Sequence, residues 1–185
     1  MIEDAPVPSW TLFAGERRLA AGLPAEVAVH AHAATQHDHD GPVLVFEDAS
    51  GRVVDLDLRG APAEVAARYT PKAEPRPRGR PKLGVVAREV TLLPRHWEWL
   101  AAQPGGASVA LRKLVEAARR ADGGGTGRKA RQEAAYRFMA SMAGDLAGYE
   151  EALRALFADD RERFDAEVAP WPDDVAAHAR RLAWD

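Results

Sequence analysis

A short basic segment near the middle of the chain, residues 76–82, holds the side chains best suited to bind a polyanion. Its sequence is Arg-Pro-Arg-Gly-Arg-Pro-Lys, with Gly79 between Arg78 and Arg80. Glycine lets a backbone lie against the floor of a narrow groove, and the prolines favour an extended peptide. Arg78 and Arg80 could then point along the minor groove of an A·T tract, where negative potential is concentrated. The segment therefore predicts a minor-groove contact; the alternative is a charged linker that only separates two domains.

The core Pro77-Arg78-Gly79-Arg80-Pro81 resembles the AT-hook, a peptide that binds in the minor groove of A·T-rich DNA. The resemblance implies that five residues of this segment contact DNA: Arg76, Arg78, Gly79, Arg80 and Lys82. Arginine- and proline-rich sequences are also common in linkers, so the linker interpretation stays open. We expect double-stranded, A·T-rich DNA as the partner and no cofactor.

The distribution of charge favours a local site for an anionic partner. Residues 72–131 hold 14 of the 25 Lys and Arg residues but only 5 of the 28 Asp and Glu residues, a net charge of +9. The rest of the chain carries 11 basic and 23 acidic residues, a net charge of −12. A cationic centre between anionic flanks is typical of a DNA-contacting module. Alternatively, the acidic flanks pair with the basic centre within one protein.

The composition predicts a soluble globular protein. Of the 185 residues, 46% are hydrophobic and 29% are charged, enough for a core and a polar surface. The absence of cysteine excludes disulfides, thiol catalysis and cysteine-based zinc sites. No apolar run has the length of a membrane span, and the first residues lack the basic start of a signal peptide. We expect a cytoplasmic, nucleoid-associated protein with no membrane contact.

The first 70 residues are expected to form a small α+β domain. Apolar and alternating segments predict strands, and a proline at the first turn predicts a helix start. The expected strands are residues 9–15, 42–47 and 52–58, and the expected helices are residues 24–34 and 60–69. In the last strand, Val54, Leu56 and Leu58 should face the core, and Asp55 and Asp57 should face water.

Four of the six histidines lie within ten residues and are interleaved with carboxylates. Imidazole and carboxylate groups bind zinc, nickel or copper, so one hypothesis is the metal site of a metal-dependent enzyme. The candidate ligands are His30, His32, His37, His39, Asp38 and Asp40. Against a site, the first two histidines are two residues apart and would point about 200° apart on a helix. We expect a solvated polar loop that holds no metal.

Residues 71–83 are expected to be the linker that contains the hook, and residues 84–121 read as strand, helix, helix. The strand would end at Leu93-Pro94, and the helices would span residues 95–103 and 107–120. This order resembles the ribbon-helix-helix fold of bacterial and phage repressors. The resemblance implies a homodimer whose paired strands lie in the major groove of DNA. The alternative is an ordinary α+β core in which Trp97 and Trp99 pack.

The second helix of this segment carries an apolar stripe and a charged remainder. The stripe is Leu111, Leu114, Val115 and Ala118. Ser108 is expected to cap the helix, where free amides can hold a phosphate. Arg88, Arg112 and Lys113 complete the expected DNA contacts. Arg88 faces outward in one register of the predicted strand and is buried in the other, so its role in reading bases stays open.

Residues 126–185 predict a helical C-terminal domain. The expected helices are residues 128–143, 148–158, 159–168 and 173–184. In the first of these, Ala135, Phe138, Met139 and Met142 share one face, which is the pattern of a core-facing helix. The tail shows no catalytic constellation, so we do not expect an enzyme.

As a whole, the order of the segments resembles an uncharacterised bacterial family, domain of unknown function 2239. The resemblance is carried by the hairpin at residues 43–60, the sequence from Gly79 to Trp97 and the tail from Phe138 to Leu182. It implies no activity, substrate or catalytic residue. We therefore predict an α+β protein that binds DNA as a regulator or nucleoid-associated factor. The alternative is a protein-interaction module whose basic centre docks an acidic partner or its own acidic flanks.

Overall fold

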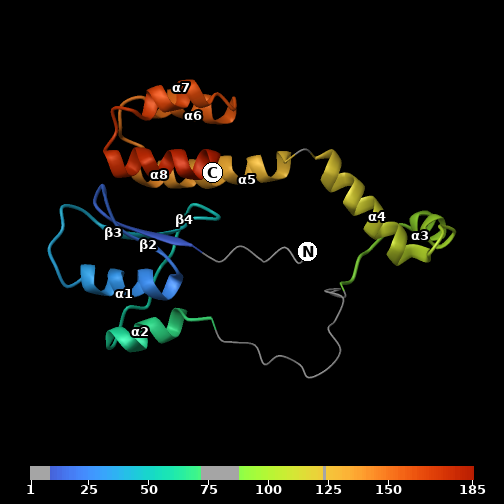
Figure 1. Cartoon of the computed structure of the whole chain (residues 1–185), viewed down its shortest axis with the longest axis horizontal. Coiled ribbons are helices and arrows are strands. Elements are labelled where there is room, and N and C mark those ends of the chain that lie inside the picture. Colours follow the sequence, from blue (N-terminus) through green and yellow to red (C-terminus); the bar gives the residue numbers. More distant parts are fainter. Residues whose placement is uncertain (1–8, 72–87, 123) are drawn as a thin grey trace. The chain divides into compact units, whose positions relative to one another are not determined.

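A computed structural model describes residues 9–71, 88–122 and 124–185. Within these ranges the chain forms one four-stranded antiparallel sheet and eight helices, which confirms the predicted α+β class (Figure 1). The chain divides into two compact units. We call residues 9–71 and 127–185 the sheet unit, and residues 88–122 and 124–126 the hairpin unit.

The sheet has the strand order β2-β1-β3-β4. Its strands are β1 (Trp10–Ala14), β2 (Arg17–Gly22), β3 (Val43–Glu47) and β4 (Arg52–Val53). β1 lies in the centre and pairs antiparallel with both β2 and β3. β2 was not among the predicted strands, because its sequence Arg-Arg-Leu-Ala-Ala-Gly lacks an alternating apolar pattern.

Successive residues of β1 and β3 pack in two different hydrophobic cores, one on each face of the sheet. Leu12 and Val45 point to one face of the sheet, where α1 (Pro24–Ala34) covers them. Phe13 and Phe46 point to the other face and join a larger core with residues of α5 (Gly125–Met142) and α8 (Asp173–Trp184). α2 (Pro62–Tyr69) packs on α1 (Figure 1). Because side chains alternate along a strand, this central pair of strands can hold helices on both faces.

The predicted strand at residues 52–58 pairs over only its first two residues, β4. After Val54 the segment leaves the ladder, and Leu56 and Leu58 pack against the α1 core together with Val54. The predicted inward direction of these three residues is therefore confirmed.

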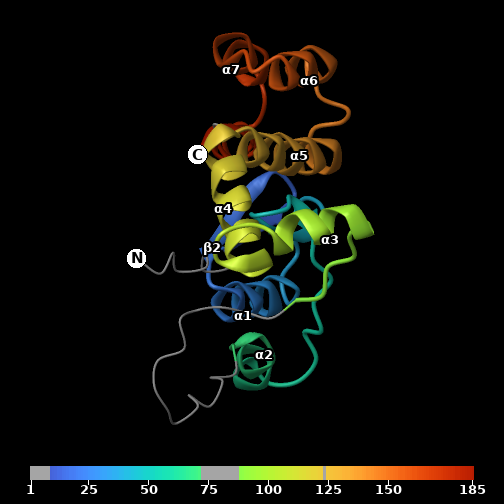
Figure 2. The same cartoon turned by 90° about the vertical axis from the view of Figure 1, so that its right-hand side faces the viewer.

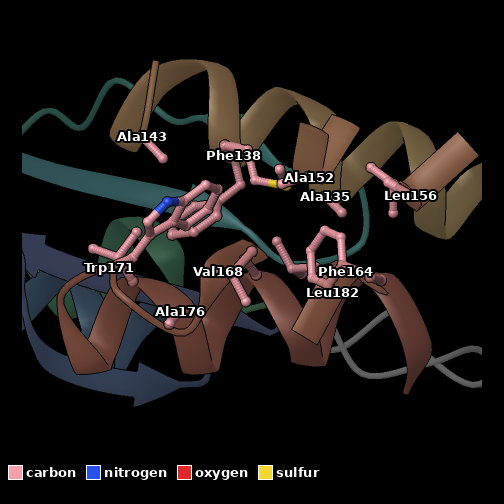
Figure 3. Close-up of a cluster of buried hydrophobic side chains, with 14 of the residues drawn as sticks. Ala135, Phe138, Ala143, Ala152, Leu156, Phe164, Val168, Trp171, Ala176 and Leu182 are labelled. Carbon is pink, nitrogen blue, oxygen red and sulfur yellow. The ribbon is translucent and has the colours of Figure 1, made fainter. Parts of the chain in front are cut away.

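Four helices from the end of the chain complete the larger core of the sheet unit. α6 (Tyr149–Phe157) and α7 (Arg161–Val168) lie between α5 and α8 in sequence, and Asp160 caps α7 by accepting a hydrogen bond from the Arg163 amide. Figure 3 shows side chains that fill this core, among them Phe138 of α5, Phe164 of α7 and Trp171 between α7 and α8. The first 70 residues and residues 126–185, treated separately in the sequence, share this core.

A close backbone approach fixes the β3–β4 turn to α5. Gly51 has φ +65°, and a Cβ atom there would lie 1.9 Å from the carbonyl oxygen of Ala134. The Arg137 guanidinium also donates a hydrogen bond to the carbonyl oxygen of Ser50, at 3.1 Å. Only glycine fits this turn, since it tolerates positive φ and has no side chain to meet the helix.

The hairpin unit consists of α3 (Pro94–Ala101) and α4 (Gly106–Ala121), joined by a short turn (Figure 2). Among its described residues, only Leu100 and Ala110 are buried hydrophobic side chains. Residues 88–93, the described part of the predicted strand, have no regular secondary structure. Both predicted helices are present, but the described residues do not show the ribbon of a ribbon-helix-helix fold.

Candidate nucleic-acid interface

The basic side chains of α4 gather along one side of the helix. All four are exposed: Arg112, Lys113, Arg119 and Arg120. Lys113 follows Arg112 by one residue, and Arg119 and Arg120 follow Arg112 by seven and eight, so the four side chains lie on adjacent rows of the helix surface. Glu116 is the carboxylate among them and lies 3.7 Å from the Arg119 guanidinium. Arg112 donates a hydrogen bond from Nε to the carbonyl oxygen of Ser108, at 3.2 Å. Besides the Arg119–Glu116 pair, the charged groups of Arg112, Lys113 and Arg120 therefore face solvent on this side of the helix.

The N-terminus of α4 differs from the prediction. The helix begins at Gly106, after Gly105 in the left-handed region at φ +87°, and no side chain caps it. Ser108 lies inside the first turn with an exposed side chain, so the prediction that it caps the helix is wrong. The helix begins directly after Gly105, because a glycine can adopt the left-handed conformation that ends the four-residue connection from α3.

Part of the apolar stripe of α4 is exposed among the described residues. Leu114 and Val115 are 48% and 55% exposed, and on α3 Trp97 and Trp99 are 40% and 53% exposed. Large apolar side chains grouped on one small unit usually mark a surface that binds another macromolecule. α4 thus presents a basic side and an apolar side.

The other predicted DNA contacts fall in two places. Arg76, Arg78, Gly79, Arg80 and Lys82 lie outside the described residues. Arg88 is exposed and lies in the segment without regular structure that precedes α3. The structure therefore brings Ser108, Arg112 and Lys113 together on the first turns of α4 and places Arg88 elsewhere in the hairpin unit.

The histidines of the His30–Asp40 region are held by backbone carbonyl groups. The Nδ1–H groups of His30, His32 and His37 donate to the carbonyl oxygens of Glu26, Leu58 and Ala33, each at 2.9 Å. His39 instead lines an open cleft of about 710 Å³ with Asp38, Asp40 and Glu16. Within the described ranges, no group of three or more histidines and carboxylates is arranged to hold a metal ion.

A buried polar cluster in the sheet unit was missed by the sequence analysis. His178 on α8 is 0% exposed, and its ring lies against Phe13 and Phe138 at centroid distances of 5.4 and 4.5 Å. Arg181, one turn later, lies 3.0 Å from Oδ2 of Asp48 and donates a hydrogen bond to His178 Nδ1, at 3.1 Å. The cluster links the first strand, the β3–β4 turn and the last helix.

The contacts of His178 fix its tautomer. Arginine only donates, so Nδ1 must be the accepting nitrogen and Nε2 carries the proton. Nε2 lies 3.7 Å from Asp48 Oδ1, too far for a hydrogen bond, and has no partner among the described residues. Burial, and next the charge of Arg181, lower the pKa of His178 to about 4, although Asp48 acts in the opposite direction. The ring is therefore neutral near pH 7.

The polar cluster contains the residue types of a hydrolase triad, but its hydroxyl groups are not hydrogen-bonded to the histidine. The hydroxyl groups of Ser9 and Thr11 donate to the two oxygens of Asp48, at 2.7 and 2.8 Å, and neither donates to His178. A hydroxyl nucleophile needs a base within hydrogen-bond reach, and this arrangement does not provide one. The cluster instead joins three elements of the core. The sequence signal was the position of His178 on the apolar stripe of α8, between Val175 and Leu182.

The model of one protein family matches residues 9–183 of the chain; its description reads "Uncharacterized protein conserved in bacteria (DUF2239)". No curated protein and no solved structure matches the chain. Among the helices of the described ranges, none is long and apolar enough to cross a membrane.

Proposed function

We propose that this chain, which belongs to the bacterial family DUF2239, is a DNA-binding protein that acts as a regulator or a nucleoid-associated factor. In this proposal the Arg78-Gly79-Arg80 core enters the minor groove of A·T-rich DNA. The basic side of α4 lies on the phosphate backbone. The two contacts are close in sequence, since α4 begins fewer than 30 residues after the core.

The observation that carries the proposal is the exposed basic side of α4. Arg112 and Lys113 extend from one turn of the helix and Arg120 from a later one, and all three are exposed. Contacts to phosphates position a protein and supply most of the non-specific affinity, whereas the groove contact supplies the base preference. Since the minor groove distinguishes mainly A·T from G·C pairs, we expect a coarse preference for A·T-rich sites.

The exposed apolar side chains of α3 and α4 suggest a dimer, which would raise the affinity of weak hook–DNA contacts. A second copy of the chain that covers Trp97, Leu114 and Val115 would place two hooks on one DNA molecule. Binding of the second hook would then be intramolecular, which raises the overall affinity without any new type of contact. We therefore propose a homodimer through α3 and α4.

A second candidate function, a module that docks an acidic protein, is favoured by the same two sides of α4. An amphipathic helix of a partner could place apolar residues on Leu114 and Val115 and carboxylates against Arg112 and Lys113. In this case the attraction depends on the charge of the partner and not on the shape of a DNA groove.

The experiment that separates these functions measures binding of the full chain to A·T-rich and G·C-rich duplexes and to heparin across a salt series. One variant, Arg78→Ala/Arg80→Ala, removes the hook arginines, and a second, Arg112→Ala/Lys113→Ala, removes the α4 cations. A matched control, Arg17→Ala/Arg52→Ala, removes two exposed arginines of the sheet unit. Fluorescence anisotropy of labelled duplexes gives the affinities.

We expect the first variant to lose the A·T preference and the second to weaken binding to both duplexes equally. Each phosphate contact contributes about 0.9 to the slope of log affinity against log salt concentration, so the second variant should lower that slope by about 2. The control should change neither. Equal binding of wild type to heparin and both duplexes, or an unchanged A·T preference in the first variant, would refute DNA recognition and favour the acidic partner.

A further inference from the structure

We propose that the outer edge of β3 is a docking site for an extended peptide of a partner protein, with alternating apolar residues and a basic residue near one end. The site lies entirely within the sheet unit, and its evidence is independent of the proposed DNA binding. It rests on unpaired backbone groups, on the groove beside them and on the charge at the rim of that groove.

The register of the sheet identifies the unpaired groups. Gly15 donates to the carbonyl oxygen of Pro42 and Asp48 donates to that of Ser9, so even-numbered residues of β3 bond to β1 and odd-numbered residues face outward. Outward, the Val54 amide donates to the carbonyl oxygen of Val45, at 2.7 Å. No described residue pairs with the amides of Val43 and Val45 or with the carbonyl oxygen of Val43. Two donors and one acceptor of β3 thus have no partner among the described residues.

The edge is open because the chain that should cover it turns away. Continued pairing in the β3–β4 register would place Asp55 and Leu56 opposite Leu44 and Val43, but among the described residues the pairing ends with the bond from the Val54 amide to Val45. An apolar groove of about 320 Å³ remains between β3 and this segment. Its lining includes the side chains of Val43, Val45, Val54, Leu56 and Leu58. A strand added here would find backbone partners and apolar contacts together.

The opposite edge of the sheet shows that an exposed strand need not be a binding site. β2 begins with two exposed arginines, its ladder with β1 is irregular at Leu12 and Phe13, and the Arg18 amide donates to the carboxylate of Asp174, at 2.9 Å. Charge, a register shift and a side-chain partner are the features that keep edges from pairing. The edge of β3 carries two valines and none of these features among the described residues.

Charge at the groove selects the partner. Asp55 is the only ionisable residue that lines the groove; it is exposed and forms no ion pair within the described ranges. A lysine or arginine on the added strand could lie against it, whereas an acidic peptide would be repelled. Since alternate side chains of a strand point to one face, every second residue of the partner should be apolar to enter the groove.

The test uses the full chain and a capped probe peptide of sequence Lys-Val-Thr-Val-Thr-Val-Thr. Binding is measured by calorimetry, and hydrogen exchange by NMR reports the amides of Val43 and Val45. We expect binding that slows exchange at both amides. A probe methylated at its backbone nitrogens keeps its side chains but cannot donate, so it loses the one hydrogen bond to the Val43 carbonyl oxygen and should bind roughly fivefold more weakly.

Reversing the charge of Asp55, at the rim of the groove, tests whether this carboxylate selects a basic peptide. Asp55→Lys should weaken binding of the lysine probe about fivefold and improve binding of the same peptide with glutamate in place of lysine. Asp145→Lys, at an exposed carboxylate away from the groove, is the control and should change neither affinity.

Three results would overturn the proposal. The first is no binding at millimolar probe, and the second is equal binding of the methylated probe. The third is slowed exchange at Val43 and Val45 that depends on protein concentration without peptide, because the edge would then pair with a second copy of the chain. Failure of DNA binding by the same protein would leave this site unaffected.

Discussion

The sheet unit and the hairpin unit differ in where they place their aromatic residues. In the sheet unit Phe13, Phe46 and Phe138 are completely buried and contact one another, with centroid distances from 4.9 to 6.0 Å. In the hairpin unit Trp97 and Trp99 are about half exposed, although they belong to a helix. The sheet unit thus buries a cluster of its aromatic side chains, although Tyr136 and Phe157 are exposed, whereas the hairpin unit exposes both of its tryptophans.

This difference indicates which unit is stable without a partner. Burying a large apolar side chain contributes roughly 1.5–3 kcal/mol, and the sheet unit gains this many times over. The hairpin unit buries Leu100 and Ala110 among its described residues, which is too little to offset the entropy of ordering two helices. We infer that the hairpin unit by itself is the less stable of the two.

The largest effect should come from Phe138→Ala. Phe138 lies against Phe13, Phe46 and the ring of His178, so its removal leaves a cavity shared by the sheet and the C-terminal helices. We expect a loss of about 3–5 kcal/mol in the free energy of unfolding, measured by urea denaturation. Because both parts share the core, circular dichroism and the fluorescence of Trp10 should report one transition.

Tyr136→Ala on the same helix is the control for this substitution. Tyr136 is 38% exposed, so its replacement should cost about 1 kcal/mol or less. Two separate transitions in Phe138→Ala, with the strands unfolding independently of the helices, would contradict a single sheet unit.

The second effect is a loss of stability in acid that depends on His178. The pKa of the folded ring is lowered to about 4, whereas the ring in the unfolded chain has its ordinary value of 6.5. Between these values the unfolded chain binds a proton that the folded protein does not, so the free energy of unfolding falls as the pH falls. The contribution of His178 is complete above pH 6.5, and up to about 3 kcal/mol should be lost by pH 4.

The variant His178→Gln isolates this contribution from that of the carboxylates. Its amide oxygen can still accept from Arg181, but it does not titrate, so the difference in stability between wild type and variant should shrink from pH 6.5 to pH 4. His30→Gln, at an exposed histidine of α1, serves as the control. A constant difference across this range would show that His178 does not cause the acid sensitivity.

Regular periodicity made much of the fold predictable from the sequence. The face of Ala135, Phe138 and Met139 is buried as predicted, and the last helix has the predicted bounds, 173–184. Proline and glycine marked helix boundaries, because proline fixes φ and glycine adopts the left-handed conformation that ends many helices. The basic residues of α4 were also visible as a group, because i, i+7 and i+8 spacing places them on one side of any helix.

The features that escaped the sequence depend on contacts between distant segments. The Asp48–His178–Arg181 cluster joins residues more than 120 positions apart, and no local pattern pairs them. β2 forms because β1 offers an edge for pairing, although its own sequence predicts little. The expected DNA contacts at residues 76–82 lie outside the described residues and stay a prediction.

The smallest effect should come from Leu114→Ala, compared with the same change at Leu156. Leu156 is fully buried in the sheet unit, so Leu156→Ala should cost about 2–5 kcal/mol. Leu114 is 48% exposed, and Leu114→Ala should change the unfolding of the sheet unit by no more than about 0.5 kcal/mol. If a second copy covers α4, Leu114→Ala should instead weaken self-association in analytical ultracentrifugation. A stability loss that matches Leu156→Ala at every protein concentration would mean that Leu114 is buried in the monomer, and the contrast between the two units would fail.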